Sequence, residues 1–205
     1  MEQRTDEWFQ ARLGKVTASK VSDVMAKGRG NTPSATRANY MAQLAAERLT
    51  GTPPENFTNA AMQWGTDHED EARAAYEFLT DCEVELVAFV DHPLIEKTGA
   101  SPDGLVGSRG LVEIKCPNTA THIKTLLGGS IDGKYLKQMH LQMMCCERDW
   151  CDFVSYDPRL PAEMQLHVER VERDESLVDA IVQALIPFHA ELDEMVDSLR
   201  AKFLA

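Results

Sequence analysis

Apolar residues recur at helical spacing along much of the chain, most clearly at its C-terminal end. From Asp174 onward they fall every three or four residues, which places them on one face of a long helix. They are Leu177, Ile181, Leu185, Phe188, Leu192, Met195 and Leu199. Pro187 lies inside this helix and is a candidate kink. The same spacing, with start and stop signals, predicts shorter helices over residues 5–12, 17–25, 36–50, 59–79, 119–127 and 135–146.

Short apolar runs bounded by turn residues predict β-strands over residues 84–90, 152–156 and 165–171. Between the first two runs, a Gly-Ser-Arg-Gly turn separates two apolar segments, so residues 104–115 are expected to form a β-hairpin. Strands and helices in this order indicate an α/β fold built on a mixed sheet, an α+β arrangement. A chain of 205 residues is expected to form a single domain, 1–205.

The stretch SPDGLVGSRGLVEIKCP, residues 101–117, carries the clearest chemistry. If the hairpin turn centres on Ser108 and Arg109, Asp103 falls nearly opposite Ile114. Side chains alternate along a strand, so Glu113 and Lys115 share one face. Two carboxylates and the Ile114 carbonyl form a hard-oxygen site that suits Mg²⁺ or Mn²⁺, and Lys115 can hold or polarise an attacking water. A Glu/Lys pair alone is typical of an ordinary surface hairpin, but the Ser-Pro-Asp-Gly stretch upstream favours the metal site.

Charge and cysteine content limit the class of protein. A net charge of −12 argues against a broad DNA-coating surface, although not against a local basic channel. The five cysteines form no Cys-x-x-Cys pair and are expected to be reduced and mostly buried. No apolar run approaches the roughly 20 residues that span a bilayer, and the N-terminal stretch has no apolar signal core. We therefore expect a cytoplasmic protein with no membrane partner.

Polar residues near the N-terminus allow two interpretations. Thr17 and Ser19 open a predicted helix, so they are N-caps or, together with Arg12, ligands of a phosphate at the helix N-terminus. Composition alone favours caps. The loop at 26–35 is rich in Gly, Ser, Asn and Pro and contains Arg29, which indicates either a flexible basic loop or a solvated linker.

Two of the predicted helices carry further candidates. Glu69 lies near the apolar stripe of the 59–79 helix and is a candidate metal or water contact. Gln138 and Gln142 lie one turn apart on the 135–146 helix. The plain interpretation of this glutamine pair is two exposed amides on an amphipathic helix.

Several of these blocks occur together in one family. They are RLGKVTAS (12–19), the WG…E…A helix (64–72), SPDG (101–104), LVEIKCP (111–117), a Tyr…Gln pair (135–138) and SYDPR (155–159). From about residue 8 to about 175, the chain resembles the phage lambda exonuclease group of PD-(D/E)xK nucleases, the viral recombinase-type alkaline exonucleases. The resemblance implies a restriction-endonuclease-like core flanked by helices. It divides the domain into end-binding helices (1–80), a catalytic core (81–172) and a C-terminal helical segment (173–205).

The family resemblance also implies an activity. Its members are Mg²⁺-dependent 5′-to-3′ exonucleases that degrade one strand of duplex DNA from 5′-phosphorylated ends. They leave 3′ single-stranded overhangs for phage recombination by single-strand annealing. The implied partners are double-stranded DNA ends, two further copies of the chain in a homotrimeric ring, and a single-strand annealing protein. The expected location is the host cell cytoplasm.

Catalytic roles follow from the resemblance residue by residue. Asp103, Glu113 and the Ile114 carbonyl would bind two Mg²⁺ ions, with Mn²⁺ as an alternative. Glu69 would reach the second ion through water. Lys115 would orient or deprotonate the nucleophile.

DNA-binding roles follow in the same way. Arg12, Thr17, Ser19 and Ser101 would hold the terminal 5′-phosphate. Ser101 would couple this pocket to the metal site, because it lies two residues before the first carboxylate.

Three further roles are implied. Gln138 would help to position the attacking water, Arg29 would reach into the minor groove, and Met62 would be an apolar wedge that splits the end base pairs. The chain departs from the family pattern at Thr121, near which a basic residue is expected.

Two alternative functions stay open. The same core serves structure-specific or repair endonucleases, and closed circular duplex DNA discriminates, because an exonuclease must leave it intact. The second alternative is a non-catalytic DNA-end-binding protein, against which the intact set of Asp103, Glu113 and Lys115 argues. Iron–sulfur nucleases of the superfamily are disfavoured, since the cysteines do not bracket the core in a four-ligand pattern.

Overall fold

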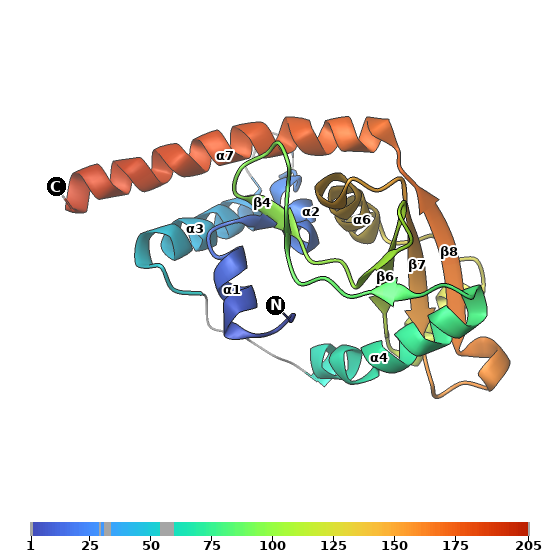
Figure 1. Ribbon diagram of the computed structural model, residues 1–205. Helices are drawn as coiled ribbons and strands as arrows, with labels where there is room; N and C mark the ends of the chain where they lie inside the picture. Colours follow the sequence, from blue (N-terminus) through green and yellow to red (C-terminus); the bar gives the residue numbers. More distant parts are fainter. Residues whose placement is uncertain (1, 29, 31–33, 54–59, 205) are drawn as a thin grey trace.

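A computed structural model describes residues 2–28, 30, 34–53 and 60–204 of the chain. It contains a five-stranded mixed sheet with helices on both faces (Figure 1), which confirms the predicted fold class. The strand order is β2 (Val84–Glu85), β5 (Gly104–Val106), β6 (Gly110–Lys115), β7 (Trp150–Tyr156) and β8 (Leu166–Glu172). The central pair, β6 and β7, is parallel, and the other pairs are antiparallel.

A second, three-stranded sheet corrects the prediction of one strand over 84–90. Its strands are β1 (Val16–Thr17), β4 (Thr98–Ala100) and β3 (Val90–Asp91). Val84 pairs with Val106 in the large sheet, whereas Val90 pairs with Ala100 in the small one. The apolar run therefore changes sheets between its ends. Strands of two or three residues are too short to give a readable alternation, which is why β1 and β4 were not predicted.

Most of the predicted helices are confirmed, with ends that shift by one or two residues. They are α1 (Asp6–Arg12), α3 (Ala35–Thr50), α4 (Ala60–Thr80), α5 (Thr119–Leu126), α6 (Gly133–Cys146) and α7 (Glu175–Phe203). The last runs as one helix through Pro187. The helix predicted over 17–25 is wrong in its first half, because Thr17 belongs to β1. A 3₁₀ turn, Ala18–Lys20, then leads into the short α2, Val21–Val24.

The hairpin register differs by one residue from the predicted one. Gly104 pairs with Val112 and Val106 with Gly110, so the turn is centred on Ser108 alone. A three-residue turn begins at Gly107, whose φ of 54° is a left-handed conformation that glycine adopts without steric cost. Continued by one residue, this register sets Asp103 opposite Glu113 at the end of β6 rather than opposite Ile114.

Layers on both sides of the large sheet orient its central strand. Val112 and Ile114 pack in a cluster with Tyr76 of α4. Leu111 packs with Met139 of α6 on the opposite face. Because side chains alternate along a strand, the two charged residues at the end of β6 face α6. In Figure 1, α6 lies between the sheet and α7, and α4 lies on the other face.

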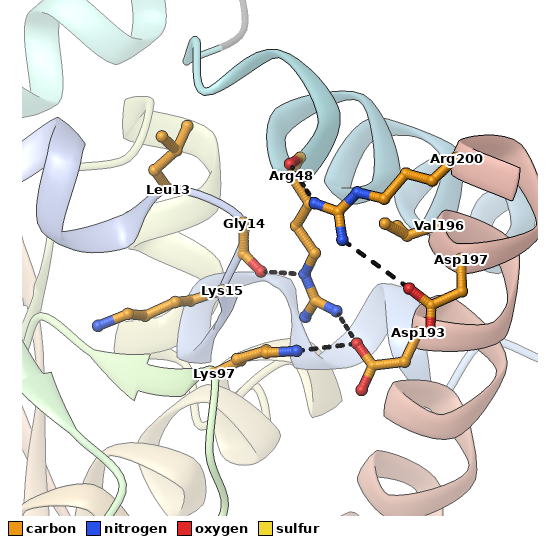
Figure 2. Close-up of a pocket in the computed structure, with 9 residues that line it drawn as sticks. All are labelled: Leu13, Gly14, Lys15, Arg48, Lys97, Asp193, Val196, Asp197 and Arg200. Carbon is orange, nitrogen blue, oxygen red and sulfur yellow. Dashed lines mark hydrogen bonds and ion pairs between the residues drawn. The ribbon is translucent and has the colours of Figure 1, made fainter. Parts of the chain in front are cut away.

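A polar junction fixes the segment between α1 and β1. Arg48, near the end of α3, donates to the Gly14 carbonyl at 2.8 Å and to Asp193 of α7 at 2.6 Å (Figure 2). The Gly14 N–H donates to buried Glu47 at 2.8 Å. Gly14 has a φ of +67°, and a Cβ there would lie 2.7 Å from Arg48 Cγ, so the junction requires glycine. A cavity of about 480 Å³ adjoins it.

The five cysteines are free thiols, as predicted, although Cys145 and Cys151 are buried and the other three only partly so. None of the helices in the described part of the chain is long and apolar enough to cross a membrane.

Candidate active site

Glu113 is fully buried, and both of its carboxylate oxygens accept hydrogen bonds. Oε1 accepts from Lys115 Nζ and, at 2.6 Å, from Gln138 Nε2. Oε2 accepts from Gln142 Nε2, also at 2.6 Å. These donors come from β6 itself and from the facing side of α6, so two helical turns and one strand hold the carboxylate in a fixed orientation.

The interpretation of the glutamine pair as exposed amides is wrong. Gln142 is fully buried and Gln138 is partly buried. Their spacing of four residues puts both on the face of α6 that meets the sheet. A signal was present in the sequence: Gln142 is flanked by Leu141 and Met143, which are buried as well, and a polar residue inside such a run needs a polar partner.

Asp103 joins the same end of β6 through its own hydrogen bond. Its Oδ2 accepts from the Ile114 N–H at 2.6 Å. Burial and the charge of Glu113 raise the pKa of Asp103 well above its usual value, and Lys115 only partly offsets this. For Lys115, burial alone would lower the pKa, but Glu113 and Asp103 raise it, so the side chain is held as an ammonium.

A cavity of about 1210 Å³ collects most of the predicted catalytic residues. Asp103, Ile114, Lys115 and Glu69 all border it. Glu69, from α4, forms an ion pair with Arg4 in which Nη2 and Oε2 are 2.5 Å apart. The structure thus brings Asp103 and Ile114, from the hairpin and its approach, to the same cavity as the Glu69 carboxylate from a different layer, while Glu113 is buried and is not among the residues that border it.

Basic residues outnumber acidic ones among those that border the cavity, although the chain is acidic. Five of the residues that border it are basic and three are acidic. The basic ones are Arg4, Lys115, Lys124, Lys134 and Arg159, and the acidic ones are Glu69, Asp103 and Asp132. Lys124 lies one helical turn from Thr121, so α5 supplies a basic residue near the position at which the family pattern expects one. This excess of positive charge suits a polyanion.

The predicted phosphate ligands form two contacts. Arg12 Nη1 donates to Ser101 Oγ at 3.1 Å, and Thr17 Oγ1 lies 3.3 Å from Ser19 Oγ. Thr17 occupies the N-cap position of the 3₁₀ turn, but its side chain makes no capping hydrogen bond, so the cap interpretation does not hold for it. Ser19 is exposed and borders the large cavity.

Trp8 contacts both Arg12 and Ser101 and was not predicted as a site residue. Its Nε1 donates to Ser101 Oγ at 2.9 Å, and its ring lies 4.1 Å from the Arg12 guanidinium carbon. The ring therefore orients the arginine by a cation–π contact. A tryptophan in the first helix of a sequence is usually a core residue, so the pattern gave no signal for this role.

Ser155 and His122 form a contact near the cavity that was also not predicted. His122 is fully buried; its Nε2 lies 2.8 Å from the Met164 carbonyl, and its Nδ1 lies 2.7 Å from Ser155 Oγ. The carbonyl can only accept, so Nε2 carries a hydrogen. Ser155 pairs with Lys115 across the parallel strands and borders the cavity.

The remaining predicted residues are placed as follows. Met62 borders the cavity in the first turn of α4 and is 55% exposed. Arg29 lies outside the described residues, so its minor-groove role stays a prediction.

Metal binding can be tested against the donor chemistry. Across the described ranges, no group of three or more His, Cys, Asp or Glu side chains is placed to hold a metal ion. The candidate site depends instead on two carboxylates and a main-chain oxygen. Burial first, and then the charge of Glu113, raise the pKa of Asp103, and a cation at this place would favour its ionised form; hard oxygens suit Mg²⁺ or Mn²⁺. The residues therefore fit a divalent cation.

Comparison with known proteins places the chain in a family. The model of the YqaJ-like viral recombinase domain matches residues 7–149. The chain belongs to the YqaJ-like viral recombinase family. Within this family, the predicted resemblance to the lambda exonuclease group is confirmed, and so is the restriction-endonuclease-like fold.

Solved structures similar to this YqaJ-like protein include the alkaline exonuclease LHK-Exo from Laribacter hongkongensis. It is 53% identical, with 97% of each chain covered and a TM-score of 0.90, and it has also been solved in complex with dAMP. A phage-related exonuclease from Haemophilus somnus 129PT is 16% identical over 90% of this chain and 96% of its own, with a TM-score of 0.69, and shows the fold alone. No curated protein matches the chain. The predicted enzyme class, an exodeoxyribonuclease, is confirmed at the level of the family.

Proposed function

We propose that this protein is a Mg²⁺-dependent exonuclease that degrades the 5′-ended strand of duplex DNA from 5′-phosphorylated ends and leaves 3′ overhangs. The observation that carries the proposal is the convergence of Asp103, Glu113 and Lys115 at one end of β6, beside a basic cavity. Exonuclease activity agrees with the family of this chain. It also agrees with the similarity of the chain to the alkaline exonuclease LHK-Exo, which is 53% identical to it. The direction, the metal and the end preference are the proposed refinements.

In this proposal, Asp103, Glu113 and the Ile114 carbonyl hold the divalent cations, with Glu69 reaching one of them through water. Bound there, Mg²⁺ would lower the pKa of a water molecule and neutralise charge on the scissile phosphate. The hydrogen bonds from Gln138 and Gln142 fix the Glu113 carboxylate before substrate arrives. Such preorganisation avoids rearranging the site during the reaction.

Lys115 acts as a hydrogen-bond donor rather than as a base. Without a bound cation, Glu113 and Asp103 raise its pKa despite burial, which favours the ammonium form. Its ammonium can orient the attacking water or donate to a phosphate oxygen. Of the two roles considered for this residue, orienting the nucleophile is therefore the one that its surroundings support.

Recognition of the 5′-phosphate is assigned to Arg12, Ser101, Thr17 and Ser19. Arg12 is held by Ser101 and by the ring of Trp8, so its guanidinium is oriented before a phosphate binds. Ser101 lies two residues before Asp103, which ties the end-binding pocket to the cutting site. This link supports a preference for phosphorylated ends.

A homotrimeric ring and a single-strand annealing partner complete the proposal. The chain has a net charge of −12, yet basic residues are in excess around the cavity. In a ring, only the channel would need to attract DNA, while the acidic exterior would repel it. The annealing protein would coat the 3′ overhang. Both partners rest on the family resemblance.

The proposal is tested by incubating the purified protein with linear and with covalently closed circular duplex DNA, each with Mg²⁺ or with a chelator. We expect degradation of the linear duplex only, and only with Mg²⁺. Glu113→Ala and Lys115→Ala are each expected to slow degradation by about a hundredfold or more while DNA binding persists. Cleavage of the closed circle would favour an endonuclease, and full activity of both variants would refute the site.

A further inference from the structure

Arg4 lies beside the candidate active site without a role in the function proposed so far. It borders the same cavity as Asp103 and Lys115, and it pairs with Glu69 at 2.5 Å. Its side chain is 48% exposed. An ion pair in contact with solvent contributes little to stability, so this guanidinium can exchange the carboxylate for a stronger partner.

The backbone of Arg4 is in the left-handed region, with a φ of 69°. This conformation is unfavourable for residues other than glycine. Asp81 and Glu147 share it, but each directly follows a helix, where a left-handed residue ends the helical hydrogen-bonding pattern. Lys97, directly before β4, shares it away from any helix end and pairs with Asp193. Arg4 precedes α1 and ends no helix. Unfavourable backbone conformations of this kind often occur at functional sites.

Gln3 fixes the backbone next to Arg4. Its Nε2 donates to the main-chain oxygens of Val87 and Pro102, each at 2.9 Å. Pro102 directly precedes Asp103. The segment that carries Arg4 is therefore tied to the loop that carries the first catalytic carboxylate, and the arginine is held within reach of the site although its side chain is partly in solvent.

We propose that Arg4 binds a backbone phosphate of the DNA strand in the cavity, and that its ion pair with Glu69 is the resting position it leaves when DNA arrives. The inference rests on the proposed function and adds a substrate contact to it. A guanidinium donates two parallel hydrogen bonds to a phosphate, whereas here a single nitrogen contacts Glu69. The exchange also releases the Glu69 carboxylate toward the cation site.

The test is the affinity of the full-length protein for a linear 5′-phosphorylated duplex, measured by fluorescence anisotropy in chelator at several salt concentrations. Arg4→Gly is expected to weaken binding about tenfold and to reduce the salt dependence by about one phosphate contact. Thermal unfolding is expected to show no loss of stability, because glycine suits the left-handed backbone.

Arg109→Ala is the matched control. Arg109 is also an exposed arginine in an ion pair, 2.5 Å from Asp149, but it is not among the residues around the cavity. The variant removes the same charge, and we expect the affinity for DNA to stay within about twofold of wild type. A loss equal to that of Arg4→Gly would mean that net charge alone sets the affinity, and would overturn the assignment.

A second comparison separates phosphate binding from simple neutralisation of Glu69. If Arg4 contacts DNA, Arg4→Gly weakens binding in the Glu69→Gln background at least as much as in wild type. If Arg4 only screens the carboxylate, the substitution has no effect in that background, and the inference is wrong. Failure of the wild-type protein to degrade DNA would instead count against the proposed function, so the two failures are distinguishable.

Discussion

At the residue scale, the candidate site depends on how one buried carboxylate is held. Glu113 has no solvent exposure, and its oxygens are bonded to Lys115, Gln138 and Gln142. Burying a charge is costly unless it is paired and hydrogen-bonded. The glutamines on α6 therefore do two things: they stabilise the charge in the free protein, and they aim the carboxylate toward the end of β6.

This arrangement predicts the effect of Gln142→Leu. The substitution leaves Glu113 Oε2 without its 2.6 Å donor, so we expect the free energy of unfolding to fall by about 1–3 kcal/mol and kcat to fall with it. Chemical denaturation measures the first and DNA degradation the second. Gln63→Leu is the control, because Gln63 donates to Asp67 at 2.7 Å on an exposed face of α4. Equal stability losses in both variants would contradict the account of the buried carboxylate.

At the element scale, the part of the site that lies on β6 could be predicted from the strand alone. Alternation of side chains correctly placed Glu113 and Lys115 on one face and Val112 and Ile114 on the other. Periodicity also gave the long helices. What it could not give was which helix would meet which face of the sheet, because that depends on tertiary packing. Gln142 was therefore assigned to solvent, although α6 buries it against Glu113.

Short elements escaped prediction for a different reason. Strands β1 and β4 contain two and three residues, and their hydrogen bonds join positions about eighty residues apart, such as Val16 and Thr98. No local pattern encodes such a pairing. The predicted hairpin register was wrong by one residue. Gly107 adopts a positive φ, and the turn contains three residues between the paired positions Val106 and Gly110.

The contact between β4 and α7 predicts a pH dependence. His189 Nε2 lies 2.8 Å from Thr98 Oγ1. Burial, followed by the charges of Arg48 and Lys97 and opposed by Asp193, lowers the pKa of His189 from 6.5 to about 4. A folded-state pKa below the unfolded-state value means that the neutral form stabilises the fold. This stability is fully present above about pH 6.5 and is lost as the pH falls toward 4.

The measurement is the free energy of unfolding of wild type and His189→Gln at pH 7 and pH 4.5. Glutamine can keep the bond to Thr98 but does not titrate. We expect the wild type to lose about 1 kcal/mol more than the variant over this interval, a figure reduced for partial exposure of the ring. Identical losses in the two proteins would show that His189 does not contribute.

At the scale of the whole molecule, charge is distributed unevenly. The chain carries a net charge of −12, yet five basic residues face the cavity that contains the candidate catalytic residues. Repulsion from the acidic surface and attraction at the cavity would together direct DNA toward one place. The proposed end-binding residues Arg12 and Ser101 are in contact with each other, and Ser101 lies two residues before the first carboxylate. In the proposed function, recognition of an end and cleavage next to it would thus be joined in one part of the fold.

The most direct test of this account compares degradation rates of linear duplexes that differ only in a 5′-phosphate or a 5′-hydroxyl, in Mg²⁺, with label released from the 5′-ended strand. We expect the wild type to prefer the phosphorylated end by about tenfold or more, since a charge-assisted arginine contact is lost with the hydroxyl. Arg12→Ala is expected to erase that preference. Equal wild-type rates on the two substrates, or degradation that proceeds from the 3′ end, would contradict the account.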